Sequence, residues 1–196
     1  MNETRTLNGT TLEAELADHV RQAEAQKSEV TDLLTRLDAE QLNWRLEPNR
    51  WSIGEHIAHL SLTNKQYVDA IDRAVREARG RGWTGSGPYR YGWFGNWFVR
   101  GMEPPPRMRV RTFRTLEPSR NRSGSDILGE FIATQNGLIA ALKTASGVDL
   151  GRAKFRSPFV RMLRLSVGQG FGAVLAHNRR HLWHARRILS AAGFPT

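Results

Sequence analysis

The sequence predicts an all-α fold, a four-helix bundle with a long crossover between its second and third helices. Four long segments repeat apolar residues at three- and four-residue steps, as amphipathic helices do, and no alternating strand pattern competes with them. The chain has 196 residues, of which 39% are hydrophobic, which is enough for one sizeable core and short for two. We therefore expect a single bundle domain over residues 1–196.

The first two helices are defined by their starts as well as by their apolar faces. The first is predicted over residues 11–38, where Thr10 and Glu13 have the spacing of a capping box. The second is predicted over residues 52–79, because the serine that opens it and Glu55 repeat this spacing.

A long connection separates the second helix from the third. Glycine and proline interrupt the helical pattern over residues 80–124, and within them only residues 93–100 are predicted as a short helix. The last two helices are predicted over residues 125–145 and 167–191. A connection of this length could let the second and third helices run parallel to each other.

Three of the six histidines lie within two turns of the last helix, in the stretch HNRRHLWH. His177, His181 and His184 share one stripe, which has core-type residues at both of its ends. Imidazoles in such a position need hydrogen-bond partners or a ligand. The i, i+4 pair His177 and His181 can direct two nitrogens at one metal ion, and the second helix could supply a third ligand from His56 or His59.

The runs LNWRLEPNRWSIGEHIAHL and HNRRHLWH together resemble the DinB-like superfamily, which includes YfiT-type metal hydrolases and bacterial thiol transferases. The resemblance extends from the first predicted helix to the last. It implies that a divalent metal is bound by His59, which lies eight residues after Trp51, and by His177 and His181 of the HxxxH motif.

Four other residues near these positions admit more than one interpretation. His184 stands where many relatives have glutamine, and it could line the pocket or make an ordinary hydrogen bond. His56 could support the ligands or simply cover the helix start, which we favour. Glu55 could act as a base or orient His59, but its capping role already explains its presence. His19, in the first helix, is interpreted as structural.

One divalent metal ion is the implied cofactor, with zinc the first choice and nickel or iron also suited to three histidines. Neutral imidazoles leave the ion its full charge, so it would lower the pKa of a bound water or thiol. Together with the resemblance, this indicates a metal-dependent transferase of a low-molecular-weight thiol, or a metal-dependent hydrolase. The chain contains no cysteine, so the thiol would be a small-molecule substrate.

A net charge of +10 favours anionic partners, and residues 89–122 interleave arginines with aromatic residues. This pattern is typical of nucleic-acid-binding proteins, but equally of a crossover that packs its aromatic residues on a bundle, and we do not favour nucleic acid. The alternatives kept open are a nucleic-acid-binding stress protein and a metal-binding bundle without catalysis. We expect the arginines of the crossover to act on small anionic ligands, whereas Arg179 and Arg180 should face away from the histidines.

The aromatic residues between Trp93 and Phe98 are expected to cover the site or to meet a second subunit in a homodimer. The patch is too short to favour a membrane surface. The sequence also has no secretory pattern and no apolar run long enough to cross a bilayer. We therefore expect a cytoplasmic protein with no membrane partner.

Overall fold

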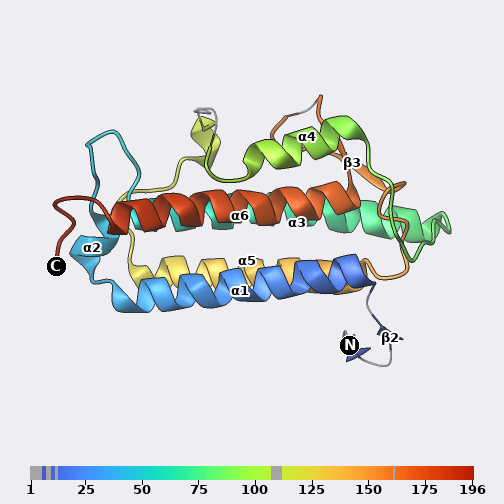
Figure 1. The fold of residues 1–196 in the computed structure, drawn as a ribbon, viewed down its shortest axis with the longest axis horizontal. Helices are drawn as coiled ribbons and strands as arrows, with labels where there is room; N and C mark the ends of the chain where they lie inside the picture. Colours follow the sequence, from blue (N-terminus) through green and yellow to red (C-terminus); the bar gives the residue numbers. More distant parts are fainter. Residues whose placement is uncertain (1–5, 8–9, 12, 107–111, 161) are drawn as a thin grey trace.

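A computed structural model of the protein describes residues 6–7, 10–11, 13–106, 112–160 and 162–196. Two short helices, α2 (Ala39–Asn43) and α4 (Trp93–Met102), lie in its connections. The all-α bundle predicted from the sequence is confirmed, and no helix in the described ranges is apolar over enough residues to cross a membrane. The four long helices of the bundle (Figure 1) are α1 (Ala14–Arg36), α3 (Ile53–Gly80), α5 (Gly124–Thr144) and α6 (Val167–Leu189).

Short extended segments are the elements that periodicity did not predict. β1 (Thr6–Leu7) pairs antiparallel with β2 (Thr10–Thr11), and β3 (Lys154–Arg156) forms an antiparallel hairpin with β4 (Arg164–Ser166). A 3-10 turn, η1 (Arg114–Leu116), lies in the crossover after α4. Strands of two or three residues are too short to display an alternating pattern, so the sequence could not reveal them.

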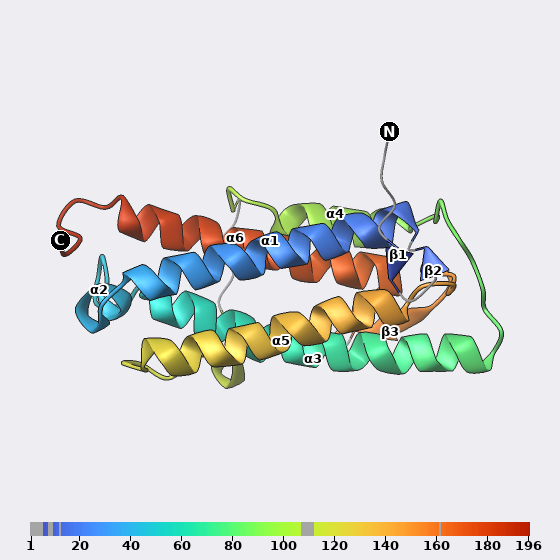
Figure 2. The same ribbon diagram turned by 90° about the horizontal axis from the view of Figure 1, so that it is seen from below.

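The long helices form two layers, with α1 beside α5 and α3 beside α6 (Figure 1). The colours show that α3 and α5 run in one direction along the bundle, and that α1 and α6 run in the other (Figures 1 and 2). The crossover therefore joins two parallel helices, as its length suggested. α4 and the β3–β4 hairpin lie on the outer side of the α3–α6 layer, where α4 contacts both α6 and β4.

Of the two predicted capping boxes, the one at the start of α3 is present and the one at the start of α1 is not. Ser52 caps α3, because its hydroxyl accepts the Glu55 backbone N–H at 3.2 Å and its own backbone N–H donates to the Glu55 carboxylate at 2.8 Å. The box predicted at Thr10 and Glu13 is wrong, since Thr10 lies in β2 and Glu13 is itself the N-cap of α1. The Glu13 carboxylate instead accepts the backbone N–H of Gly147 at 2.8 Å.

A polar layer halfway along the bundle divides the core into two apolar clusters. One cluster contains Phe171 and the other Phe131, and both of these side chains are fully buried. Between the clusters, each long helix contributes one buried amide side chain: Gln26 from α1, Asn64 from α3, Gln135 from α5 and Asn178 from α6.

Hydrogen bonds connect these four amides across the bundle. The Asn178 amide donates to Gln26 Oε1 at 2.9 Å, and the Asn64 amide donates to Asn178 Oδ1 at 3.0 Å. The Gln135 amide donates to the backbone carbonyl of Ala23 at 3.2 Å. A buried amide that loses its partner costs free energy, so this layer disfavours any sliding of one helix along another.

Replacing Asn178 with alanine is expected to destabilise the bundle, because the Asn64 N–H loses its partner and Gln26 Oε1 keeps only the longer bond from the Gln135 amide at 3.4 Å. We expect the free energy of unfolding, measured by urea titration, to fall by roughly 1–3 kcal/mol for each buried group left unpaired. The matched control is Asn136→Ala on α5, which removes an exposed contact with Lys27 and should cost less than about 0.5 kcal/mol. Equal losses in the two variants would contradict the role of the amide layer.

Candidate metal site

The structure brings together the three histidines that the sequence singled out as candidate metal ligands. His59 lies in the second turn of α3, and His177 and His181 lie near the middle of α6. One ring nitrogen from each lies within 4.8 Å of the other two, an arrangement that could hold one metal ion. The Asn64–Asn178 hydrogen bond sets the register of the two helices beside this cluster.

Distances within the cluster suit the geometry of a metal site. The Nε2 atoms of His177 and His181 are 3.1 Å apart, whereas two nitrogens bound to one tetrahedral zinc ion lie roughly 3.3 Å apart. His59 Nδ1 donates to the backbone carbonyl of Leu116 at 2.8 Å. This bond places the proton on Nδ1 and leaves the lone pair on Nε2, as is usual for metal-binding histidines.

His56 and His184 extend the cluster beyond the three candidate ligands. His56 Nδ1 lies 2.9 Å from His181 Nδ1, on the opposite edge of the His181 ring from His177. The His56 and His184 rings are stacked, with their centroids 5.1 Å apart and 4° between their planes. His56 therefore contacts His181, in addition to lying in the first turn of α3 as we favoured from the sequence.

Trp51 forms one wall of the cluster, a role that the sequence did not reveal. Its ring centroid lies 4.8 Å from that of His59, 5.4 Å from that of His56 and 6.0 Å from that of His181. The eight-residue spacing from Trp51 to His59 was its only sequence signal.

Glu55 is buried and fully engaged away from the cluster. Its carboxylate accepts the Ser52 N–H, pairs with Arg45 at 2.9 Å and lies 3.8 Å from Arg120. The Glu55 side chain is only 5% exposed, and the ion pair with Arg45 holds its carboxylate in place. The capping role proposed from the sequence therefore accounts for Glu55.

Arg179 and Arg180 were both expected to face away from the histidines, and the structure agrees for Arg179 only. Arg179 does face away, since it pairs with Glu103 and donates to Gln22. Arg180 lies closer to the histidine stripe along α6, and its guanidinium donates to the backbone carbonyl of Gly101 in α4 at 3.5 Å. It lies three residues after His177 and four before His184, which places it on an adjacent stripe of the same helix face.

The aromatic side chains of α4 do not close over the histidines as expected. Trp93 is 79% exposed and Trp97 is 65% exposed. The helix packs on the first turns of α6 through Gly95, which lies against the Gln169 side chain. The Gln169 amide donates to the Gly92 carbonyl at 2.7 Å. α4 therefore turns Trp93, Phe94 and Trp97 toward solvent, whereas Phe98 packs on the core.

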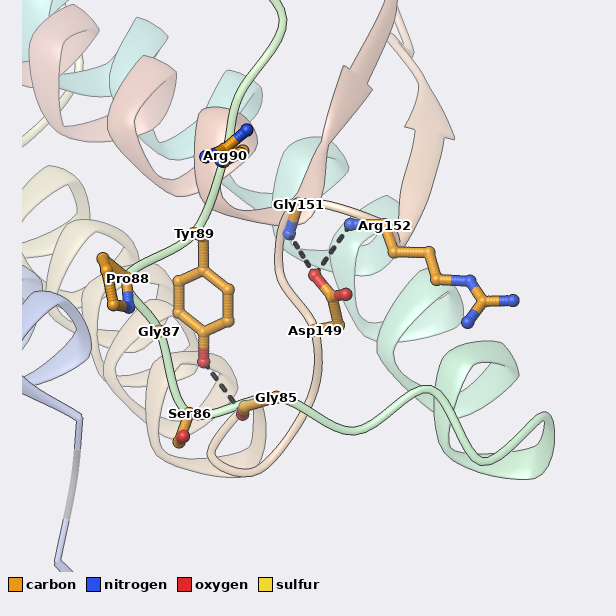
Figure 3. A pocket seen from close by; sticks show the side chains of 9 residues that line it. All are labelled: Gly85, Ser86, Gly87, Pro88, Tyr89, Arg90, Asp149, Gly151 and Arg152. Carbon is orange, nitrogen blue, oxygen red and sulfur yellow. Dashed lines mark hydrogen bonds between the residues drawn. The ribbon is translucent and has the colours of Figure 1, made fainter.

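Two cavities lie away from the histidine cluster. The larger, of about 430 Å³, is lined by loop residues 85–90 and 149–152. Figure 3 shows that its polar groups serve the loops themselves, because Asp149 accepts two backbone N–H groups and Tyr89 donates to Gly85. The smaller, of about 200 Å³, is lined in part by His19, whose pKa is lowered mainly by burial. Neither cavity includes a residue of the cluster.

Burial lowers the pKa of every histidine in the cluster. The pKa of His56 and that of His177 fall to about 3, because burial and then neighbouring positive charge disfavour the protonated ring. Burial likewise lowers the pKa of His59 and of His184, and lowers that of His181 well below 6.5. All five imidazoles are therefore neutral at pH 7, the state in which a ring nitrogen can bind a metal.

The metal-free protein is expected to lose stability as the pH falls below 6.5. Between pH 6.5 and about 3 the unfolded chain protonates His56, whereas the folded chain does not, so the free energy of unfolding decreases toward acid. Thermal unfolding of chelated protein across this range measures the effect. The variant His56→Gln removes one such group and should show a shallower decrease. An unchanged pH dependence would contradict a neutral, buried His56.

Comparison with known proteins gives one family match. The model of the DinB superfamily matches residues 22–185, a range that begins in α1, ends in α6 and includes all five clustered histidines. No curated protein and no solved structure matches the chain. Because the match covers well over half of the sequence, the chain belongs to the DinB superfamily.

Proposed function

We propose that the protein is a metal-dependent transferase that joins a low-molecular-weight thiol to an electrophilic small molecule. The observation that carries the proposal is the cluster of His59, His177 and His181, in which three neutral ring nitrogens converge without a carboxylate among them. Membership of the DinB superfamily supports it.

The donor set fits one divalent ion. His59 already has its second nitrogen bonded to a carbonyl, and His181 has its second nitrogen against His56, so both rings are held in one orientation. Three uncharged ligands fit zinc first, and nickel or iron also. Such an ion keeps its positive charge and lowers the pKa of a thiol or water that approaches it.

The surroundings of the cluster favour thiol transfer over hydrolysis. Hydrolysis of an amide or ester gains from a general acid that protonates the leaving group, a role often taken by a carboxylate. Glu55, the nearest acid in sequence to His59, is already bonded to Ser52 and Arg45. Thiol transfer needs no such group when the leaving group departs as a stable anion, and the thiol proton passes to solvent.

Residues of the chain also indicate where the substrates bind. His59 and His181 are buried, whereas His177 is partly exposed, so access to the cluster is from the His177 side. Arg180 follows His177 by three residues on α6, and its guanidinium, which donates one bond to the Gly101 carbonyl at 3.5 Å, could also hold the carboxylate of a small thiol. Trp51 provides an apolar surface against the rings of His59 and His181.

Purified protein is expected to bind about one divalent ion per chain, counted by elemental analysis. Alanine variants of His59, His177 and His181 should each lose the ion, and His19→Ala should retain it. His56→Ala should weaken metal affinity by roughly 10–100-fold, because His181 loses its orienting partner. Saturating metal should stabilise the folded state by roughly 2.7 kcal/mol at a hundredfold excess over Kd. Full metal content in His177→Ala would contradict the ligand set.

Metal-loaded protein is expected to accelerate the reaction of a small thiol with a chloro-dinitro-arene, measured by absorbance. The acceleration should vanish in chelated protein and in His181→Ala, and should return when the chelated wild type is reloaded with metal. Arg180→Gln should retain its metal and raise KM for thiols that carry a carboxylate more than for those that do not. Equal rates in all samples would argue against thiol transfer, and activity on esters or amides alone would favour hydrolysis.

A further inference from the structure

α4 presents an unpartnered aromatic face to solvent. Trp93, Phe94 and Trp97 are 79%, 49% and 65% exposed, and Phe94 lies between the two tryptophans, stacked on Trp97 at 5.8 Å and edge-on to Trp93 at 5.8 Å. Large aromatic side chains are rarely this exposed together, and a contiguous apolar patch of this kind marks an interaction surface.

The β3–β4 hairpin extends this face with aliphatic side chains. β4 contacts α4, and both elements stand on the outer side of the α3–α6 layer (Figure 1). Near the tip of the hairpin Met162 is 93% exposed and Val160 is 44% exposed. A membrane partner was not expected from the sequence because the patch on α4 is short, but the hairpin adds a second apolar projection beside it.

Positive charges surround these apolar side chains. Arg156 and Arg164 are exposed and lie directly opposite each other in the hairpin, and Lys154 is exposed on the same face of β3. The exposed Arg90 and Arg100 flank the aromatic residues of α4.

Charge is also distributed unevenly between the two layers of the bundle. Residues 13–40, which include α1, carry eight acidic and three basic residues. Residues 150–196, which include the hairpin and α6, carry nine basic residues and no acidic one. An anionic surface would therefore attract the α4 side of the molecule and repel the α1 side.

We propose that the exposed residues of α4 and of the hairpin together form a docking surface for an anionic phospholipid bilayer. Tryptophan and arginine are the residues that lie at the boundary between acyl chains and headgroups. Met162 and Val160 suit acyl chains, whereas they offer nothing to the bases or phosphates of nucleic acid. A second copy of this face would bring Arg156 and Arg164 against the same charges, which disfavours self-association.

The test is co-sedimentation of the full chain with vesicles. We expect binding to vesicles of equal parts phosphatidylcholine and phosphatidylglycerol, and much weaker binding to phosphatidylcholine alone. The double variant Arg156→Gln/Arg164→Gln should weaken binding to the anionic vesicles by roughly thirtyfold. The double variant Trp93→Ser/Trp97→Ser should weaken it by at least about tenfold, and should lose fluorescence quenching by brominated acyl chains.

The control is Leu46→Ser, which removes a side chain that is 54% exposed outside this surface and should bind vesicles like the wild type. Unchanged melting temperatures would show that all variants fold. Equal binding to both kinds of vesicle, or no effect of either double variant, would overturn the proposal. Binding of duplex DNA without vesicle binding, or a dimer that Trp93→Ser/Trp97→Ser dissociates without vesicle binding, would overturn it in favour of those partners.

Discussion

The hydrogen-bonded layer of four amides is the constraint on which the rest of the structure depends. Apolar side chains can slide past one another at modest cost, whereas each of these amides, Gln26, Asn64, Gln135 and Asn178, loses a specific partner if its helix shifts. The layer therefore fixes the relative heights of the four helices. Because Asn178 directly follows His177, the same constraint positions the candidate metal site.

Burial gives the histidine cluster an unusual relationship with protons and metal ions. In an exposed site, protons compete with the metal for each imidazole, and loading the metal releases them. In this cluster burial has already excluded the protons, as the pKa of about 3 for His177 indicates. A metal ion that binds near neutral pH would therefore displace no proton from these rings. The free energy needed to keep the buried rings neutral is already part of the free energy of folding.

Sequence patterns predicted those features that depend on neighbours along the chain. The four long helices, the Ser52 cap and the His177–His181 pair all follow from short-range spacing, and the structure agrees with each. The third histidine required a family resemblance, because His59 meets the pair only through tertiary packing. The Trp51 wall and the Leu116 carbonyl were missed for the same reason, whereas the hairpin was missed because its strands have only three residues each. Arg180 could have been placed correctly from its helical position alone.

The separation of His59 from His177 along the chain has a consequence for biosynthesis. A chain emerging from the ribosome exposes α1, α3 and α5 before α6, so it displays His59 long before the HxxxH pair exists. A lone imidazole binds metal weakly, and the complete donor set forms only when the last helix docks between α1 and α3. A metal ion held by these three histidines would therefore be bound only after the last helix has docked.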